Sequence, residues 1–239
     1  MISIIIPARN EEAHLGRTLS HLRKCAPADA EIIVAEGGSQ DRTADVARRW
    51  ATVVHGSDCT RAALMNAGAR AARGDVFFFL HADSFPPPGF SGMIREALSA
   101  PEVVGGAFEQ QFIEPVFGLR VATAVDRLRY RLTKNYFGDQ GIFVRRDAFK
   151  RAGGFPNKAI LEDVAFCMSM RRTGRTVLIR RPLPTSGRRF LRGGIARTFL
   201  WIAVLLLRHR LGIDTERYAA AYRKENERRK TPFVDVGVS

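Results

Sequence analysis

The sequence predicts an α/β fold, with a mostly parallel, Rossmann-like sheet, helices on both faces and a basic helical appendage at the C-terminal end. Apolar runs alternate with segments of helical periodicity through residues 1–100. Strand–helix repeats at this rhythm build right-handed crossovers and parallel sheets. The runs are continuously apolar rather than alternating, which is typical of parallel strands that are buried on both faces.

Four strands and three helices are expected in the first hundred residues. The strands are the runs Ile2–Pro7, Glu31–Ser39, Thr52–Gly56 and Asp75–Ala82. Asn10, Ser39 and Thr60 are candidate N-caps of the three helices, because such side chains accept hydrogen bonds from first-turn N–H groups. Gly74 is a suitable C-cap for the third helix.

The pattern changes after Pro101. The expected elements are a strand with a Gly–Gly bulge, a helix, a strand, a second helix and a closing strand, over residues 103–113, 116–134, 141–146, 161–174 and 176–181. Residues 193–212 form an apolar helix bounded by Arg197 and Arg208. Its apolar run is about half of the roughly 20 residues that span a bilayer, so we expect it not to cross one.

Charge divides the chain. The net charge is +14, and residues 171–230 carry 17 basic against four acidic residues, whereas residues 1–170 carry 21 against 19. A basic appendage on an ordinary globular domain fits this imbalance. We therefore expect a globular domain and a basic amphipathic helical extension, at residues 1–190 and 191–239. The strand–helix rhythm indicates a nucleotide-binding half at residues 1–100, and the resemblance described below implies an acceptor and catalytic half at residues 101–190.

The first residues and the cysteines indicate the compartment. Met1 leads directly into a short aliphatic run without a basic segment before it, so we expect no signal peptide. Cys25, Cys59 and Cys167 are too widely spaced for a disulfide framework or a metal knuckle. We expect a cytoplasmic protein in a reducing environment.

Polar motifs follow the expected strands of the first half. They are "PARNEE", "AEGGSQD", "HGSDCTR" and "HADS". Ligands of open parallel sheets bind at the carboxyl ends of the strands, so these motifs are expected to share one site. Arg61 lies at the expected N-terminus of the third helix, where it is suited to a phosphate; the alternative is a plain surface arginine.

Asp83 is the candidate metal ligand. It follows the apolar run "FFFL" and precedes three prolines. A carboxylate is a hard oxygen ligand for Mg²⁺ or Mn²⁺, which take one or two protein carboxylates together with substrate phosphates. His81, on the same face of the strand, is a borderline ligand better suited to Mn²⁺. The alternative is that Asp83 is an N-cap for the helix after the prolines.

Six blocks carry a resemblance to a known family. In order from Ile2 to Arg172, they read "IIIPARNEE", "EGGSQDRT", "RAALMNAGARAARGD", "FFFLHADS", "GIFVRRDAFKRAGGF" and "LEDVAFCMSM". This order and spacing resemble family 2 glycosyltransferases, which are inverting, nucleotide-sugar-dependent enzymes of the GT-A fold. More narrowly, "FLHADS" and "GDQGIF" resemble a small bacterial subgroup of transferases, some linked to radical-SAM or arsenosugar gene neighbourhoods.

The resemblance implies a donor site. The family's Asp-x-Asp metal motif reads His81-Ala82-Asp83 here, so Asp83 would bind the ion that bridges the donor diphosphate, and the replaced first position leaves the choice of metal open. The family's second strand ends in an Asp pair whose second member contacts the base; here the pair reads Glu36-Gly37, so that contact is missing and Glu36 would substitute by its longer reach. The nucleotide-binding residues implied are Pro7, Arg9, Asn10, Glu11, Glu36, Arg61, Asn66 and Ala82; for Asn66, a solvated helix position is the alternative.

The resemblance also implies a catalytic centre at Glu162 and Asp163. Inverting transfer is a single displacement, in which one carboxylate takes the proton of the attacking hydroxyl while metal and arginine neutralise the leaving group. Asp163 matches the family's base, and Glu162 would orient it or the acceptor. The alternative for this pair is a favourable interaction with the helix dipole.

Two further pairs are candidate sugar, acceptor or diphosphate contacts. Asp139 and Gln140 lie in "NYFGDQGIF" and would contact the acceptor or the donor sugar; an ordinary Gly–Asp turn is the alternative. Arg188 and Arg189 follow the last strand and would clamp the diphosphate, unless they belong to the basic surface.

The predicted function is an inverting, hexosyltransferase-type glycosyltransferase that uses a UDP- or GDP-sugar, a divalent cation and an acceptor hydroxyl that is lipid-linked or on a small molecule. A nucleotidyltransferase-like enzyme is the first alternative. It predicts a glycine-rich loop with a basic residue after the first strand, whereas "PARNEEAHLG" has one Arg and no such glycine run. A nucleic-acid binder predicts aromatic residues among the basic ones, whereas the tail concentrates aliphatic residues. We therefore expect no nucleic-acid partner.

The C-terminal helix raises a second question of partners. Trp201 and several leucines lie between Arg197 and Arg208, a pattern that suits a peripheral helix on the anionic inner face of a membrane. The alternative is a helix that packs on the catalytic domain or in a homodimer.

Overall fold

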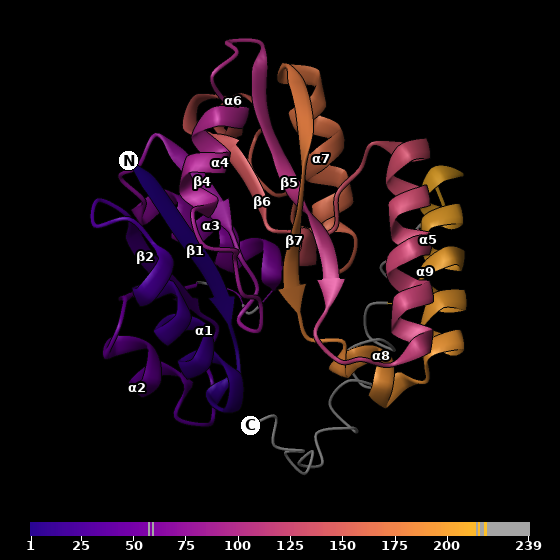
Figure 1. The fold of residues 1–239 in the computed structure, drawn as a ribbon, viewed down its shortest axis with the longest axis horizontal. Coiled ribbons are helices and arrows are strands. Elements are labelled where there is room, and N and C mark those ends of the chain that lie inside the picture. Colours follow the sequence, from indigo (N-terminus) through magenta and orange to yellow (C-terminus); the bar gives the residue numbers. More distant parts are fainter. Residues whose placement is uncertain (57, 59, 214, 216–217, 219–239) are drawn as a thin grey trace. The chain divides into compact units, whose positions relative to one another are not determined.

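The computed structural model describes residues 1–56, 58, 60–213, 215 and 218. They divide into two compact units, Met1–Ser186 and Gly187–Ser239, which are described separately below. The described strands form one sheet in the order β3-β2-β1-β4-β6-β5-β7, and Figure 1 shows β2, β1 and β4 side by side. The predicted α/β class with a mostly parallel sheet is confirmed.

The elements of the first unit follow the predicted order. Its strands are β1 (Ile2–Ala8), β2 (Glu31–Glu36), β3 (Thr52–His55), β4 (Val76–Phe79), β5 (Val103–Phe112), β6 (Ile142–Arg145) and β7 (Arg175–Thr185). Its helices are α1 (Glu12–Cys25), α2 (Thr43–Arg48), α3 (Arg61–Ala71), α4 (Phe90–Ala97), α5 (Phe117–Thr133), the short 3₁₀ helix η1 (Gly138–Gln140), α6 (Arg146–Arg151) and α7 (Glu162–Thr173).

One strand runs against its neighbours. β1 is parallel to β2 and β4, and β5 is parallel to β7, but β6 is antiparallel to both β4 and β5. Phe79, the last residue of β4, pairs with Ile142, the first residue of β6. The loop that enters β6 therefore lies at the same edge of the sheet as the segment that leaves β4.

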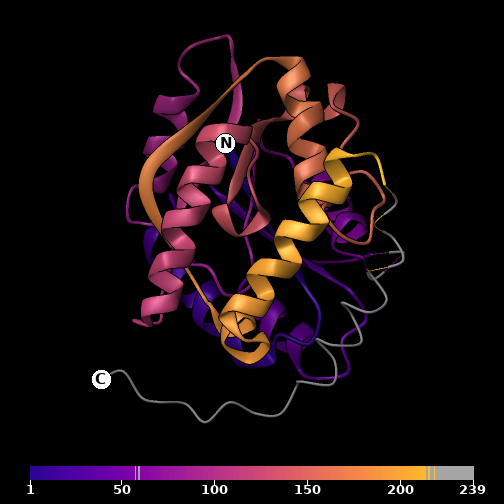
Figure 2. The same cartoon turned by 90° about the vertical axis from the view of Figure 1, so that its right-hand side faces the viewer.

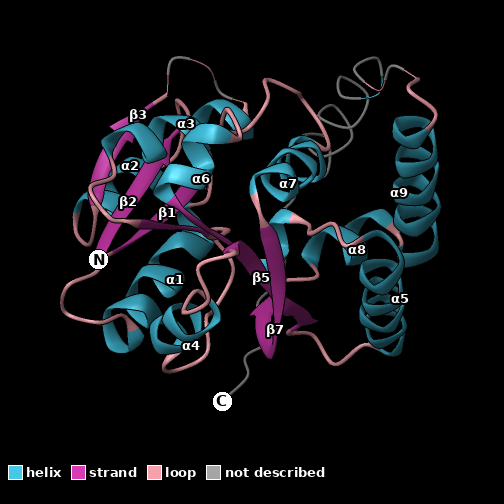
Figure 3. Ribbon diagram, turned by 90° about the horizontal axis from the view of Figure 1, so that it is seen from above, coloured by secondary structure: helices cyan, strands magenta, loops and turns pink. Residues whose placement is uncertain are grey.

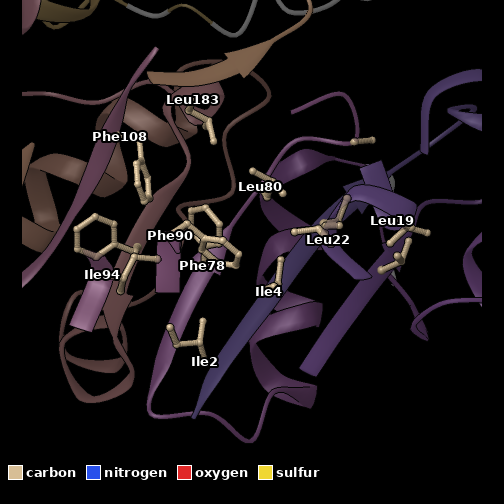
Figure 4. Close-up of a cluster of buried hydrophobic side chains, with 14 of the residues drawn as sticks. Ile2, Ile4, Leu19, Leu22, Phe78, Leu80, Phe90, Ile94, Phe108 and Leu183 are labelled. Carbon is tan, nitrogen blue, oxygen red and sulfur yellow. The ribbon is translucent and has the colours of Figure 1, made fainter. Parts of the chain in front are cut away.

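Two buried clusters cover the two faces of the sheet. Ile4 and Phe78 pack with α1 and α4 in one cluster, which Figure 4 shows in close-up. Ile5, Phe77 and Phe79 belong to the other cluster, with side chains of α3, α6 and α7. In Figure 3, α3 and α6 lie on one side of β1, and α1 and α4 lie on the other. This two-sided burial explains why these strands are continuously apolar.

The helix starts were predicted with mixed success. Thr60 caps α3 as expected, because its side chain accepts a hydrogen bond from the Ala63 N–H. The N-cap predictions for Asn10 and Ser39 were wrong. The N-cap of α1 is Glu11, one residue later, and that of α2 is Arg42, three residues later; neither makes a side-chain cap bond. Asn10 has a φ of 54°. Its N–H donates to Ser39 Oγ at 2.9 Å, so the two residues join the loop after β1 to the loop after β2 instead of capping helices. The predicted C-cap at Gly74 was also wrong, since α3 ends at Ala71.

The second unit contains α8 (Arg188–Gly193) and α9 (Ile195–Arg210). Figure 2 shows α9 as one unbroken helix after the short α8. It carries exposed apolar side chains at Leu200, Val204 and Leu207, at helical spacing. No described helix is long and apolar enough to cross a membrane. The rest of the predicted extension, residues 214, 216, 217 and 219–239, lies outside the described residues.

Candidate active site

The segment after β4 is fixed on both sides. Thr18 of α1 donates to the Ala82 carbonyl at 2.8 Å, and the hydroxyls of Ser84 and Thr185 lie 2.6 Å apart. The Ser186 N–H donates to the Asp83 carbonyl at 3.2 Å. These bonds tie the end of β4 to α1 and to the end of β7. The half-buried Asp83 is therefore held at the carboxyl edge of the sheet.

Arg61 joins the predicted metal motif to the predicted catalytic pair. It is the first residue of α3, and its Nε donates to Oε1 of Glu162, which lies 101 positions later in the chain. Its Nη1 lies 3.1 Å from Nε2 of His81, and its Nη2 lies 3.7 Å from Oδ2 of Asp163. The predicted metal ligand His81 and the predicted base Asp163 thus both lie at the guanidinium of Arg61, which was itself predicted as a phosphate contact.

Burial sets the electrostatics of this cluster. The Glu162 side chain is only 2% exposed, and burial raises its pKa even though Arg61 pulls in the opposite direction. For Arg61, burial favours the neutral form, but the carboxylates of Glu162 and Asp163 outweigh it, and the pKa is raised further. Arg61 is therefore a permanent cation, and Glu162 is the carboxylate whose charge most depends on it.

Gly138 holds Asp163 and leaves room for no side chain. Its N–H donates to Oδ2 of Asp163 at 2.7 Å, while Oδ1 accepts from the Val164 N–H at 2.8 Å. A Cβ on Gly138 would lie 2.7 Å from Nε2 of His81. Loop, histidine and carboxylate therefore meet at this glycine. Gly138 was not among the predicted site residues, although the motif "GDQGIF" contains it.

Arg129 of α5 braces the loop that carries Gly138. Its Nη1 donates to the Asn135 carbonyl at 2.9 Å, and its Nη2 donates to Oε1 of Gln140 at 3.2 Å. The guanidinium also lies 3.7 Å from the centre of the Phe137 ring. The buried Gln140 accepts from the Phe137 N–H at 2.8 Å and donates to the Phe108 carbonyl at 3.3 Å. Gln140 is thus part of the brace, and it stays only a predicted sugar contact.

Two loops form the predicted nucleoside side. Oδ1 of Asn10 accepts from the Gln40 N–H at 2.8 Å, and the Glu11 N–H donates to Oγ1 of Thr43 at 2.7 Å. These bonds lock the β1–α1 loop to the β2–α2 loop. Of the other predicted residues here, Pro7 is half-buried and Arg9 is exposed.

Glu36 serves the turn that follows β2. Its carboxylate accepts from the N–H groups of Ser39 and Gly38, and it lies 3.3 Å from Nδ1 of His55. Burial alone would raise the pKa of Glu36, but these hydrogen bonds outweigh it, and the pKa is lowered. The carboxylate is therefore ionised and shapes the loop.

Asn66 makes a structural contact within the first unit, and the arginine pair belongs to the second unit. The side-chain amide of Asn66 donates to the Phe155 carbonyl at 2.8 Å and accepts from the Phe155 N–H at 2.9 Å. It therefore fastens α3 to the turn before α7. Arg188 and Arg189 begin α8 in the second unit and stay predicted contacts. Asp139 lies in η1 next to Gly138, and its sugar contact also stays a prediction.

The donor set at the edge of the sheet suits a shared divalent ion better than a closed protein site. Among the described residues, no group of three or more His, Cys, Asp or Glu side chains could hold a metal. Asp83 offers a hard carboxylate, whereas His81 turns Nε2 towards the guanidinium of Arg61. One carboxylate together with phosphate oxygens is a common arrangement for Mg²⁺ and Mn²⁺. The residues therefore fit an ion that arrives with a diphosphate.

Comparison with known proteins identifies the family. Residues 3–173 match the family model described as "Glycosyl transferase family 2". The chain belongs to glycosyltransferase family 2. The family-level resemblance in the sequence is thereby confirmed, whereas the narrower subgroup stays a prediction.

Curated relatives of this family 2 chain match it over limited lengths. Glycosyltransferase AglE of Haloferax volcanii is 26% identical over 179 residues, which cover 66% of this chain and 57% of AglE. Validoxylamine A glucosyltransferase of Streptomyces hygroscopicus subsp. limoneus is 32% identical over 110 residues, which cover 42% of this chain and 24% of that enzyme. The chain thus spans less than two thirds of the length of these relatives.

Solved structures share the fold. The mannosyltransferase PcManGT of Pyrobaculum calidifontis, in complex with GDP-Man and Mn²⁺, has a TM-score of 0.65 at 19% identity and covers 77% of this chain and 56% of its own. Glucosyl-3-phosphoglycerate synthase of Mycobacterium tuberculosis, in complex with Mn²⁺, UDP and glucosyl-3-phosphoglycerate, has a TM-score of 0.63 at 20% identity and covers 90% and 81%. The predicted GT-A fold is thereby confirmed.

Proposed function

We propose that this chain transfers a sugar from a UDP- or GDP-sugar to an acceptor hydroxyl, with inversion at the anomeric carbon. The observation that carries the proposal is the convergence on Arg61 of His81, from the segment after β4, with Glu162 and Asp163, from the start of α7. A displacement needs its leaving-group site and its base close together, and this cluster joins them. Solved structures of similar fold in complex with GDP-Man or UDP-GlcNAc support the donor class.

The donor side of the proposal uses the edge of the sheet. The nucleoside would lie against the β1–α1 loop, which contains Asn10, and the loop after Glu36. The main chain of Ala82 would lie beside it. Asp83, with His81 next to it, would hold a Mn²⁺ or Mg²⁺ ion that neutralises charge on the diphosphate. Similar structures that contain Mn²⁺ support this assignment.

The chemical step assigned to this chain's own residues is proton removal. The acceptor oxygen forms a bond to the anomeric carbon while the carbon–oxygen bond to the diphosphate breaks, and the bonding pair leaves with the nucleoside diphosphate. The acceptor proton passes to the carboxylate of Asp163, which acts as the general base. Asp163 already accepts from Gly138 and Val164, so its orientation is set before the acceptor arrives.

Glu162 and Arg61 are proposed as positioning residues. Glu162 holds the guanidinium, and the guanidinium in turn lies against His81 and Asp163. Its positive charge would lie beside the diphosphate and would favour the charge that develops there. The geometry therefore supports Arg61 in two roles, in which it orders the carboxylates and stabilises the leaving group.

The proposal is tested by titrating UDP and GDP into the protein with and without Mn²⁺, followed by a donor screen that measures release of the nucleoside diphosphate. We expect metal-dependent binding that Asp83→Ala removes. Asp163→Asn should bind the nucleotide normally but lose about 10²–10⁴-fold in transfer. Asp147→Asn is the matched control, because Asp147 is 63% exposed in an ion pair with Arg151 and its change should leave both measurements at the wild-type level.

Three results would contradict the proposal. Nucleotide binding by Asp83→Ala at wild-type affinity would remove the donor site from this edge. Unchanged turnover by Asp163→Asn would remove the base. Release of pyrophosphate instead of a nucleoside diphosphate would identify a nucleotidyltransferase.

A further inference from the structure

Helix α5 exposes a continuous apolar stripe. The stripe consists of Phe117, Val121, Val125, Leu128 and Leu132, which are all exposed, Phe117 to 79% and Leu132 to 77%. Their spacing of three and four residues places them on one face along almost the whole helix. The opposite face packs on the sheet through Leu119, Ala122 and Thr123. An exposed apolar patch of this length marks an interaction surface.

A row of arginines runs beside the stripe. Arg120, Arg127 and Arg131 recur at helical spacing, and Lys134 follows at the end of the helix. Arg120 and Arg131 are exposed, and Arg127 pairs with Glu109 at 2.8 Å. The one acidic residue of α5, Asp126, faces away and pairs with Arg129. The surface that adjoins the stripe is therefore strongly basic.

We propose that α5 docks on an anionic lipid surface, with its apolar stripe inserted among the acyl chains and its arginine row at the headgroups. An apolar face bordered by arginine is the pattern of a helix that lies in a membrane interface. A second copy of the chain is a poorer occupant, because an antiparallel pair of facing stripes would bring two arginine rows together. Anionic headgroups instead complement the row, at roughly fivefold in partitioning for each arginine.

The docking helix is also the helix that braces the catalytic loop. Arg129 of α5 bonds to Asn135 and Gln140, and Gly138 between them donates to Asp163. If a bilayer orders α5, the effect reaches the loop beside the proposed base through a single side chain, that of Arg129. The docking surface goes beyond the proposed function, and its test needs neither donor nor acceptor.

The experiment is sedimentation of the full chain with vesicles of phosphatidylcholine alone and of phosphatidylcholine mixed with phosphatidylglycerol. We expect binding to the mixed vesicles and much weaker binding to phosphatidylcholine. Leu132→Glu should lower the affinity at least about tenfold, because it removes a fully inserted leucine. Arg131→Glu should lower affinity about 25-fold for the mixed vesicles only, since it reverses one charge.

Two matched controls lie away from α5. Trp50→Glu replaces another exposed apolar residue, 38% exposed, and Arg70→Glu reverses the charge of an exposed arginine on α3; both should bind like the wild type. Wild-type binding by Leu132→Glu, or equal binding to both vesicle types, would overturn the proposal. So would a dimer in gel filtration that Leu132→Glu dissociates, or a loss of thermal stability in Leu132→Glu without any change in sedimentation.

Discussion

Replacing Arg61 with methionine tests the centre of the site. Methionine keeps much of the volume of the arginine side chain but removes the cation that Glu162 depends on. The Glu162 side chain is 2% exposed, so water cannot replace the guanidinium without opening the site. The variant must therefore either bury an uncompensated carboxylate or keep Glu162 protonated.

The size of the effect follows from the two exposures. Breaking a fully buried ion pair costs about 3–5 kcal/mol, and an exposed pair is worth about 0.2–1 kcal/mol. The Arg61 side chain is 35% exposed, so solvent already screens part of the interaction. We expect the free energy of unfolding at pH 7 to fall by about 2 kcal/mol, or roughly 4–8 °C in Tm for a domain of this size.

The pH dependence of the stability of Arg61→Met gives an independent test of the role of Glu162. Burial raises the pKa of Glu162 above its ordinary value, and the loss of Arg61 should raise it further. Between the ordinary and the raised pKa, the folded variant binds a proton that the unfolded chain lacks, so its stability falls as pH rises through that window. The deficit relative to wild type should be largest at neutral pH and shrink as pH falls through that window towards the ordinary glutamate pKa, about 4.5.

Urea unfolding followed by circular dichroism measures these quantities. The double variant Arg61→Met/Glu162→Gln removes both charges, and it should be more stable than Arg61→Met alone at pH 7. Free-energy changes of the two single variants that simply add up in the double variant would refute the coupling. A deficit of Arg61→Met that does not vary between pH 4 and pH 7 would refute the part assigned to Glu162.

Other contacts can be tested one at a time. Gly138→Ala would place its Cβ 2.7 Å from His81 Nε2, so we expect transfer to fall by up to about 100-fold while Tm changes little; wild-type turnover would contradict this. Thr60→Ala should cost about 1 kcal/mol in urea unfolding, because it removes the cap on Ala63, and Thr60→Ser should restore most of it. Burial raises the pKa of the Cys167 thiol to about 12, so mass spectrometry should find no alkylation of Cys167 at pH 8 until the chain is unfolded. Rapid labelling of Cys167 in the folded protein would refute this.

The sequence predicted those features that depend on local pattern. The buried strands, α5 and α7 were found because apolar periodicity reports burial directly. The cap at Thr60 was also found, since a capping bond spans only three residues. Asn10 and Ser39 carry the same kind of signal, but they bond to each other across 29 positions. Local propensity could not distinguish these two cases, because tertiary contacts decide between them.

The geometry of the site lay beyond local pattern. Arg61 was predicted as a phosphate contact or a surface residue, and its bond to Glu162 spans 101 positions. Gly138 looked like part of a turn, whereas its missing side chain is what lets the loop approach His81. Arg129 was not among the predicted residues. No spacing rule links Arg61 to Glu162 or Gly138 to Asp163, because the fold brings these distant positions together.

The antiparallel strand β6 separates the segments proposed for the donor from the segment beside the proposed base. The donor segments follow the parallel strands β1, β2 and β4, whereas the segment beside the base connects α5 to the start of β6. Under the proposed function, exchanging residues 134–141 between family members would alter the stretch that contacts Asp163 without changing the pairing of Phe79 with Ile142. Chimeric enzymes built at this junction offer a route to new products from an unchanged nucleotide sugar.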